Sequence, residues 1–378
     1  MNRPTSRRRF FRNVGLGSLG AIAAGGLINA AEAEVPGEEI LGASGVKTSA
    51  RPGVSIANNT DWLDLHGRPV LAHDGHITRV QDTFYWYGSS YAGNPKGKYG
   101  TAAGFAVWNG IQAYSSQDLV AWKYEGVALP RPAKGWGAVG SVGRAHVIYN
   151  DKTRKYVMWY WYHTHYPTVF VMVATSDKPV GPFKVMGARE VGSQTGFGSD
   201  LNVFKDDDGK AYLVYTDHHT YDKKVRFGKG RHKYAILVDS LTDDYLASNK
   251  DGAVAIASGG EAPAMIRYKG KCIIAASGVQ GWNPTETTYV LADSPLGPYS
   301  KPGVMTEKKT WGGQITSFLY IRESDTLMAM CDQWWTPDKT DLNKSRYLWL
   351  PVRLSVKNGI AKMEYHKSWN PFRTNNQE

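Results

Sequence analysis

Cysteine is scarce in this chain of 378 residues, which contains two, Cys272 and Cys331. Both fall in segments that we expect to be strands, where a cysteine is more often a buried apolar residue than a reactive group. The sequence does not argue for a disulfide, so their pairing is left open. The sequence also lacks a CxxC, an HExxH and a glycine-rich phosphate-binding motif, which argues against zinc peptidases and nucleotide-dependent enzymes.

Long helical periodicity is absent after residue 40, and the basic residues are dispersed without a nucleic-acid-binding motif. We therefore expect no nucleic-acid partner. The formal net charge is +11, and residues 1–33 contribute five arginines and one glutamate, which leaves +7 for residues 34–378. This excess suits an anionic ligand such as a sulfated or uronic polysaccharide, or it is simply a basic surface.

The long apolar run of the chain lies near its N-terminus, over residues 14–31. It follows a twin-arginine pattern, SRRRFF at residues 6–11, and Ala31-Glu32-Ala33 offers an A-x-A cleavage site. The run is short and contains glycines, which favours a signal peptide over a transmembrane helix. We predict a twin-arginine signal peptide over residues 1–33, a periplasmic or extracellular protein without membrane attachment, and a surface leader over residues 34–60.

β-Hairpins recur after residue 60. Residues 198–217, GSDLNVFKDDDGKAYLVYTD, alternate apolar and polar residues on both sides of a turn in which Gly209 takes a positive φ. Five such hairpins begin with a polar residue nine or ten positions before the turn, and turn-marked segments between them indicate a second strand pair in each unit. The starting residues are Asp74, Arg144, Asp200, Glu261 and Gln314. Five four-stranded units predict an all-β fold, a five-bladed β-propeller over residues 61–378.

Three of the five starting residues are carboxylates: Asp74, Asp200 and Glu261. In a propeller the first strand of each blade lines the channel, so these residues should converge on one mouth. Polar residues that merely satisfy turns are the alternative, but turns do not require three acids at one offset. Glycoside hydrolysis needs two carboxyl groups with separated pKa values, and a third nearby carboxylate raises the pKa of the acid. The pattern therefore predicts a glycosidase.

Other residues are candidates for the pocket. Most of the aromatic residues, 12% of the chain, should fill gaps between blades, whereas Trp282 in SGVQGWNP is expected to stack on a sugar. His163 and His165 either face the pocket or close a turn. The loop over residues 218–233, HHTYDKKVRFGKGRHK, is the best candidate for contacting a sulfate or carboxylate, or it is a solvated loop. Its histidines lack the spacing of a metal site, so we predict no metal or cofactor and leave open a structural Ca²⁺ in the channel.

Several segments carry a resemblance to a known family. Asp74 with the following ITRVQDTFYWYG, SDLNVFKDDDGKAYLVY and GGEAPAMI are similar to glycoside hydrolase family 43, and the similarity covers nearly all of residues 61–355. The exo-β-1,3-galactanase branch in particular is resembled by LAHDGHI, VIYNDKTRKYVMW, FKDDDGKAYLVY, SGVQGWNP, CDQWW and SRYLWLP. The resemblance implies an inverting mechanism with Asp74 as general base, Asp200 as pKa modulator and Glu261 as general acid.

Two departures from that branch concern the site. The branch has HGG where this chain has His73-Asp74-Gly75, and it uses a glutamine as base at the place of Gln314; of the two candidates we favour the carboxylate of Asp74. The branch also has an acidic residue before the arginine of blade two, where this chain has Gly143, so galactan specificity stays open. The candidates for substrate binding are Gln314, Arg144, His73, His146, Trp282 and His163.

We therefore expect a secreted, exo-acting, inverting glycoside hydrolase on galactose-containing poly- or oligosaccharide, sulfated algal polysaccharide included. The alternatives are an anhydrogalactosidase or an arabinosidase/xylosidase on the same scaffold, and a sugar-binding propeller without catalysis. A propeller that binds protein partners does not need three acids at one mouth. The oligomeric state is not predicted. We expect the segment YLWLPVRL to close the ring, with residues 65–70 as one partner.

Overall fold

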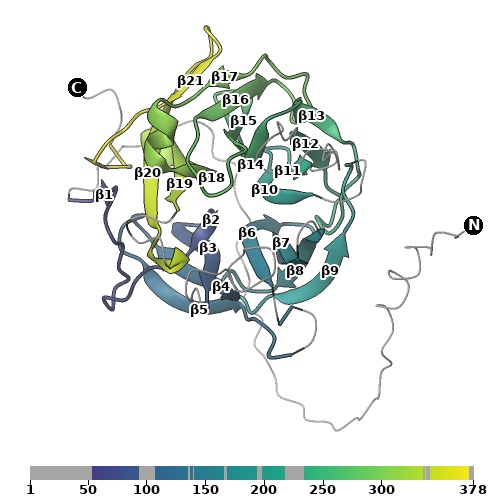
Figure 1. Ribbon diagram of the computed structural model, residues 1–378, viewed down its shortest axis with the longest axis vertical. Helices are drawn as coiled ribbons and strands as arrows, with labels where there is room; N and C mark the ends of the chain where they lie inside the picture. Colours follow the sequence, from purple (N-terminus) through teal and green to yellow (C-terminus); the bar gives the residue numbers. More distant parts are fainter. Residues whose placement is uncertain are drawn as a thin grey trace, which may run out of the picture. The chain divides into compact units, whose positions relative to one another are not determined.

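The computed structural model describes residues 53–92, 107–134, 137–138, 140–165, 168–193, 198–217, 234–334, 337 and 341–373, and for residues 164, 165 and 168 the main chain alone. Within this part, five antiparallel four-stranded sheets follow one another along the chain, each a meander in which consecutive strands are hydrogen-bonded. The sheets surround a common centre, with the first strand of each nearest to it (Figure 1). The predicted five-bladed β-propeller is confirmed.

Each blade contributes four strands, ordered from the centre of the ring outward. The innermost strands are β2 (His73–Val80), β6 (Ser141–Asn150), β10 (Ser199–Lys205), β14 (Gly260–Tyr268) and β18 (Gln314–Ile321). The second strands are β3 (Thr83–Tyr91), β7 (Lys155–His165), β11 (Ala211–Asp217), β15 (Lys271–Gly278) and β19 (Thr326–Gln333). The third strands are β4 (Trp108–Ser116), β8 (Thr168–Ser176), β12 (Ala235–Ser240), β16 (Thr287–Ala292) and β20 (Arg346–Ser355). The outer strands are β5 (Lys123–Leu129), β9 (Lys184–Arg189), β13 (Ala253–Ile256), β17 (Gly303–Val304) and β21 (Ile360–Met363).

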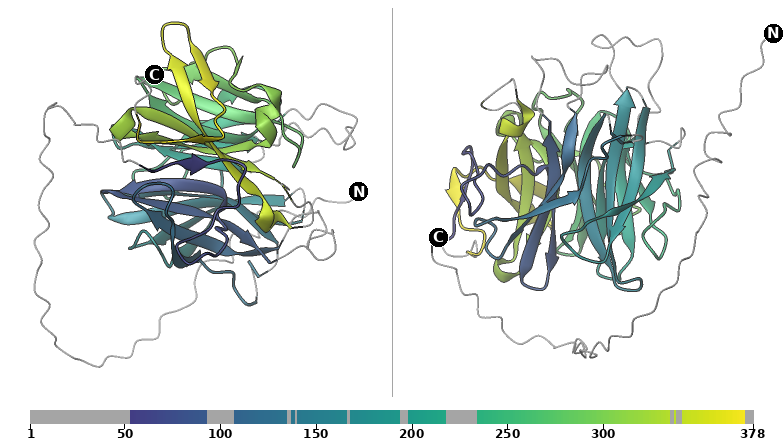
Figure 2. Two further views of the ribbon diagram at one scale, coloured as in Figure 1. Left: turned by 90° about the vertical axis from the view of Figure 1, so that its left-hand side faces the viewer. Right: turned by 90° about the horizontal axis from the view of Figure 1, so that it is seen from below.

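Short 3₁₀ segments lie between some of these strands: η4 (Lys308–Gly312), η5 (Arg322–Ser324) and η6 (Leu342–Lys344). In the side views the strands of the blades lie along one common axis, and neighbouring strands point in opposite directions (Figure 2). In the residues that the structure describes, we find no helix with the length and apolar character needed to cross a membrane.

The hairpin of β10 and β11 forms where the sequence predicts it. The main-chain N–H of Asp206 donates to the carbonyl of Lys210 at 2.8 Å, and Gly209 donates to Asp206 at 2.9 Å. Gly209 has a φ of 79°, the left-handed conformation that a glycine adopts without steric cost. This turn follows a strand that starts at the channel, so it lies at the opposite end of the blade from Asp200.

The core consists of apolar clusters between neighbouring blades. Tryptophan dominates the cluster between blades five and one, which includes Trp86, Trp122 and Trp349. Cys272 belongs to the cluster between blades three and four, and Cys331 to the cluster between blades four and five. Both cysteines are buried and free, so the open question of their pairing is answered: they form no disulfide.

The segment YLWLPVRL takes part in closing the ring, as predicted, but by side-chain contacts and not by strand pairing. It lies in β20, which pairs with β19 and β21, and the hydroxyl of Tyr347 donates to the carbonyl of Val70 at 2.8 Å. Closure also uses a small sheet of β1 (Ile56–Ala57) and β22 (Ser368–Trp369), together with Asn58, which exchanges hydrogen bonds with the main chain of Trp349 at 2.8 and 2.9 Å. The leader predicted over residues 34–60 is therefore too long, because residues 56–58 hold the seam.

Candidate active site

The innermost strand of every blade carries a β-bulge near its start. The strand register shifts between these pairs: His73 and His76, Gly143 and His146, Ser199 and Leu201, Glu261 and Ala264, and Ile315 and Ser317. A bulge takes a residue out of the ladder and re-aims its side chain. All five bulges lie at the end of the blades where the inner strands begin, so they build one ring of irregular backbone around the mouth of the channel.

The bulges correct one detail of the predicted repeat. Asp74 and Arg144 have φ values of 58° and 54°, and the equivalent residue of blade four is Ala262, at 57°. Glu261 thus stands in the register of His73 and Gly143, one position earlier than Asp74 and Arg144. The spacing of nine residues from each starting residue to the turn does not end at equivalent points of the hairpins. Thr83 already belongs to β3, whereas Gly270 lies inside the turn between β14 and β15.

Arg144 connects three blades at the mouth. Its Nε lies 2.9 Å from Oδ1 of Asp74, and both side chains are almost completely buried. Its two terminal nitrogens donate to the main-chain carbonyls of Thr316 and Ile315 in blade five, at 3.1 and 3.0 Å. The two hydrogen bonds fix the guanidinium group, and the ion pair at Nε, which lacks hydrogen-bond geometry, keeps the Asp74 carboxylate beside it.

Asp74 is the carboxyl group of blade one. Burial raises its pKa to about 6; the Arg144 cation lowers the pKa, and the nearby Asp200 raises it further. The pKa lies above the ordinary value in spite of the ion pair because water is excluded around the carboxylate. Above about pH 6 the group is ionised, which is the state that can accept a proton from water.

Glu261 is the carboxyl group of blade four. Its Oε1 accepts a hydrogen bond from the main-chain N–H of Gln280 at 3.2 Å, and it is 8% exposed. Burial raises its pKa to about 8, and the charge of Asp200 is the second cause. Among the described residues no ion pair is formed by Glu261, in contrast to Asp74. Near neutral pH it therefore holds a proton that it can donate.

Asp200 acts electrostatically on both of these carboxyl groups. It is half-buried in β10, and its charge contributes to the raised pKa values of both Asp74 and Glu261. The structure thus brings together the three predicted carboxylates and Arg144. Two carboxyl groups whose pKa values are separated by their surroundings can act as general acid and general base in glycosidic bond cleavage.

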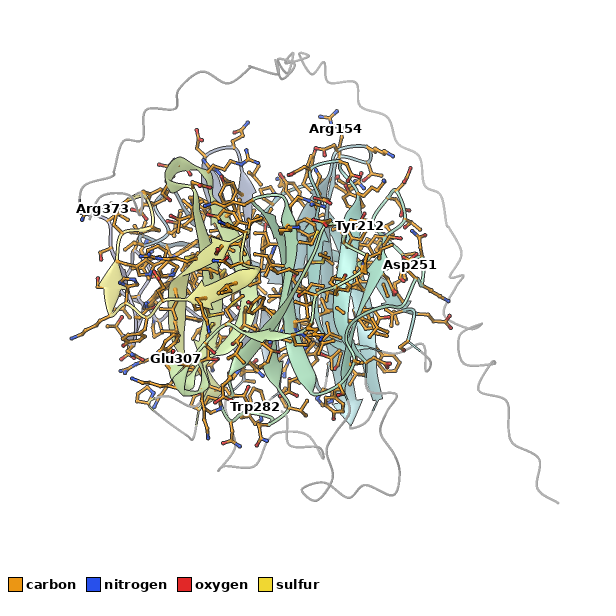
Figure 3. All side chains as sticks on the ribbon, turned by 90° about the horizontal axis from the view of Figure 1, so that it is seen from above. Arg154, Tyr212, Asp251, Trp282, Glu307 and Arg373 are labelled. Carbon is orange, nitrogen blue, oxygen red and sulfur yellow. The ribbon has the colours of Figure 1, made fainter. Side chains whose placement is uncertain are left out.

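Gln314 begins the inner strand of blade five. Its amide nitrogen donates to Oγ of Ser277 at 3.0 Å, and its amide oxygen accepts from the indole N–H of Trp334 at 2.8 Å. The rings of Trp334 and Trp282 meet edge to face, with centroids 4.9 Å apart. Trp282 lies at the end of the blades opposite to Arg154, which marks a far hairpin turn (Figure 3). The predicted sugar-stacking residue is therefore placed at the mouth, beside Gln314.

The predicted histidines His73, His163 and His146 lie at three different positions. His73 is buried behind Asp74; its ring stacks on Tyr347 at 5.3 Å, and burial lowers its pKa to about 4. His163 is buried near the end of β7, where it stacks on Trp161 at 5.5 Å. The side chain of His165 lies outside the described residues.

His146 lies deeper in the channel than the mouth. It is fully buried, stacks on His76 at 4.7 Å and is 2.8 Å from the side-chain nitrogen of Asn202. Burial is the main cause that lowers its pKa well below the usual range. This position revises the predicted role of His146: its surroundings suit packing of the channel and not contact with a substrate.

One acidic residue of the site was missed by the sequence analysis. Asp332, at the end of β19, is 2% exposed, and its Oδ2 accepts a hydrogen bond from the main-chain N–H of Asp74 at 2.5 Å. The available signal was a single acid that ends the apolar run TLMAMC. Because it belongs to a second strand, it falls outside the pattern of strand-start residues that we used.

A metal site is not apparent in the described part of the chain, where no group of three or more histidine, cysteine or acidic residues is placed to hold an ion. The basic loop over residues 218–233, proposed to contact a sulfate or carboxylate, lies outside the described residues. The Ca²⁺ ion left open for the channel and the expected lack of a cofactor stay predictions.

Known proteins are similar to this chain in sequence and in architecture. A β-D-galactofuranosidase, XynD, of Aspergillus niger is 26% identical over 272 residues, which are 67% of this chain and 71% of that protein. A family 43 β-1,3-galactosidase, solved with galactodeoxynojirimycin, is 28% identical and has a TM-score of 0.69, with 83% of this chain and all of that chain covered. An exo-β-1,3-galactanase of Phanerochaete chrysosporium, solved with β-1,3-galactotriose, is 26% identical and has a TM-score of 0.70, with 84% and 68% covered.

The sequence also matches the model of Glycosyl hydrolases family 43 over residues 67–314, which runs from the entry into blade one to the first residue of β18. The match contains Asp74, Arg144, Asp200, Glu261 and Gln314, the five residues at the starts of the inner strands. The chain therefore belongs to glycosyl hydrolase family 43, and it is a glycoside hydrolase that acts on O-glycosidic bonds from a five-bladed propeller.

Proposed function

We propose that this enzyme is an exo-acting, inverting glycosidase that releases galactose from the non-reducing end of β-1,3-linked galactan or galacto-oligosaccharides. The observation that carries this proposal is the pair of Asp74 and Glu261, whose pKa values of about 6 and about 8 lie on either side of neutral pH. The β-1,3-galactosidase and the exo-β-1,3-galactanase described above support galactose as the sugar.

In the proposed mechanism, Glu261 donates its proton to the glycosidic oxygen as the bond to the departing sugar breaks. Asp74, held by Arg144, takes a proton from the water molecule that attacks the anomeric carbon from the opposite face. Asp200 helps to keep Glu261 protonated in the resting enzyme. Inverting glycosidases place the two carboxyl groups about 6.5–9.5 Å apart, which leaves room for that water. The two groups enter from non-adjacent blades, which favours such a separation.

A substrate screen tests the proposal. We expect the full-length enzyme to release galactose as the first product from β-1,3-galactotriose, while β-1,4- and β-1,6-galactobiose are cleaved much more slowly. Chromatography of the products at early times distinguishes single sugars, which indicate exo action, from mixed oligosaccharides. Release of arabinose, xylose or anhydrogalactose from matching oligosaccharides, without any release of galactose, would contradict it.

The Aspergillus niger relative favours a second candidate, a galactofuranosidase. The two candidates differ in the ring form of the sugar and not in its identity. Parallel assays with the 4-nitrophenyl β-galactopyranoside and β-galactofuranoside therefore separate them. The proposal expects activity on the pyranoside to exceed activity on the furanoside by at least about tenfold, and the reverse ranking selects the second candidate.

We further propose that the enzyme is exported by the twin-arginine route, supported by SRRRFF and the apolar run that follows it. Replacing Arg7 and Arg8 by lysine should leave the enzyme in the cytoplasm, as a fractionation assay would reveal.

We also propose that the enzyme accepts sulfated galactans, supported by the excess positive charge of the chain. Equal rates on sulfated and desulfated oligosaccharides at low salt would argue against electrostatic attraction of the substrate.

A further inference from the structure

Asp332 lies at the seam between the last and the first blade. In β19 it stands opposite Gln314 of β18 and opposite Tyr347 of β20. Its Oδ2 nevertheless reaches blade one, where it accepts from the main-chain N–H of Asp74 at 2.5 Å. The side chain is 2% exposed, so a substrate in the pocket does not displace this contact by itself. Asp332 therefore acts on the site through Asp74.

The N–H of Asp74 needs this acceptor because of the bulge. The register shift between His73 and His76 takes Asp74 out of the ladder between β2 and β3. Asp74 also has a φ of 58°, a left-handed conformation that a residue with a side chain adopts at a cost. A buried N–H without an acceptor adds a further penalty. Asp332 removes that penalty and thereby favours the strained conformation.

The same arrangement continues into the next blade. The main-chain N–H of Arg144, the bulge residue of blade two, forms a hydrogen bond to the carboxylate of Asp74 that lowers its pKa. Blade five thus holds the bulge of blade one through Asp332, and blade one holds the bulge of blade two through Asp74. Arg144 returns to blade five through its bonds to Ile315 and Thr316. The direction of the Asp74 carboxylate depends on a closed chain of contacts that includes Asp332.

We propose that Asp332 is a positioning residue for the hydrolytic reaction: through its hydrogen bond to the Asp74 main chain, it holds the Asp74 carboxylate where it can deprotonate the attacking water. The inference rests on the proposed role of Asp74. Asp332 does not contact the reacting atoms, and it exchanges no proton with them.

Burial is the largest cause that raises the pKa of Asp332 well above the usual range, and the charge of Asp74 is the second, so both causes favour the neutral form. A protonated carboxyl group retains a carbonyl oxygen as acceptor, so the bond to Asp74 does not require a charge. The titratable and charged groups that act on this pair are Arg144, Asp200, Tyr91, Tyr347 and Cys331.

Two nearly isosteric variants test the inference in the full-length enzyme. Asp332→Asn keeps an acceptor oxygen, whereas Asp332→Leu keeps the shape without one. We expect Asp332→Asn to retain kcat within about threefold, and Asp332→Leu to lose about 10²-fold in kcat with KM little changed, as for a misplaced reacting group. The acidic limb of the pH profile of Asp332→Asn should lie close to that of the wild type, because the raised pKa of Asp332 favours a neutral carboxyl group, which the asparagine amide resembles.

A matched control is Asp239→Asn in blade three. Asp239 is also fully buried and also accepts main-chain N–H groups, from Gly192 and Gly252 at 2.7 Å each, but it belongs to β12, away from the inner strands. This variant should lower the melting temperature while kcat per folded molecule stays unchanged. It separates the loss of a buried carboxylate in general from the loss of one that positions Asp74.

The outcomes are distinct. Wild-type kcat in a folded Asp332→Leu variant, or an equal loss in Asp332→Asn and Asp332→Leu, overturns the inference. If the leucine variant does not fold, the asparagine variant decides, because it keeps the acceptor for the Asp74 N–H: a loss in kcat of more than about threefold contradicts the inference. A wild-type enzyme that releases no galactose from any substrate overturns the proposed function instead, before any variant is compared.

Discussion

Blades one and four present two carboxyl groups that are buried to a similar extent and yet differ in chemistry. Asp74 is 5% exposed and Glu261 is 8% exposed. Asp74 has the guanidinium group of Arg144 at 2.9 Å and a pKa of about 6, whereas Glu261 accepts from a neutral main-chain N–H and has a pKa of about 8. Burial alone therefore does not assign the roles of acid and base. The position of the Arg144 guanidinium group, which pairs with Asp74, distinguishes the proposed base from the proposed acid.

The largest effect is expected when the base is removed. Asp74→Asn should lower kcat by about 10³-fold or more, within the upper part of the range for general base catalysis, because an amide at this position is a far weaker base than the carboxylate. Gln314→Ala, in contrast, should retain measurable turnover, because both polar atoms of that amide already bond to Ser277 and Trp334. Initial rates on β-1,3-galactotriose measure both variants.

The opposite result would move the base from blade one to blade five. An inactive Gln314→Ala enzyme beside a nearly wild-type Asp74→Asn enzyme assigns the base to Gln314, as in the galactanase branch. Equilibrium binding of galactodeoxynojirimycin by both variants serves as a control, since a base that acts only on water contributes little to binding.

Removal of the acid should depend on the leaving group. Glu261→Gln is expected to lower turnover of a natural disaccharide by about 10²-fold or more, because the departing sugar then leaves without a proton. With a 4-nitrophenyl glycoside the loss should shrink to a few-fold, since that leaving group departs as an anion. Equal losses on both substrates would show that Glu261 does not donate the proton.

Gly143 offers a steric test of the Asp74 environment. A Cβ at this position would lie 2.6 Å from Oδ2 of Asp74 and 2.4 Å from the Trp161 ring, so Gly143→Ala must displace one of them. We expect kcat to fall about 10²-fold, as for a misplaced catalytic group. Gly209→Ala at the far hairpin turn is the control, because it strains a φ of 79° and should lower stability without changing kcat. A Gly143→Ala enzyme with wild-type kcat would mean that the position of Asp74 is not critical.

The pH dependence is the mildest test. In the proposed mechanism the active form has Asp74 ionised and Glu261 protonated, so kcat/KM should rise with pH up to about 6, stay level, and fall above about 8. Below about pH 6 and above about pH 8, the decrease in kcat/KM approaches tenfold per pH unit. With the 4-nitrophenyl substrate, Glu261→Gln should lose the alkaline limb and keep the acidic one. Loss of the acidic limb instead would exchange the two roles.

The sequence predicts much of this site because the repeat is local. Each hairpin has its own alternation and turn, and five copies suffice to predict the blades and the meeting of Asp74, Asp200 and Glu261 at one mouth. The bulges are less accessible to prediction, since they depend on which residues pair across two strands, and this is why Glu261 stands one position earlier than the repeat indicates. Contacts across the seam are the least accessible. Asp332 and Asn58 act on blades that are distant along the chain, and no local pattern marks them.

The configuration of the first-formed sugar tests the central claim most directly. The claim is that Asp74 activates a water molecule and that no covalent glycosyl-enzyme intermediate forms, so a β-linked substrate must release α-galactose. Proton NMR within the first minutes, before mutarotation, resolves the two anomers. The account predicts that the α-anomer appears first and the β-anomer grows in later by mutarotation. β-Galactose as the first product would contradict it, because it would make one of these carboxylates a nucleophile.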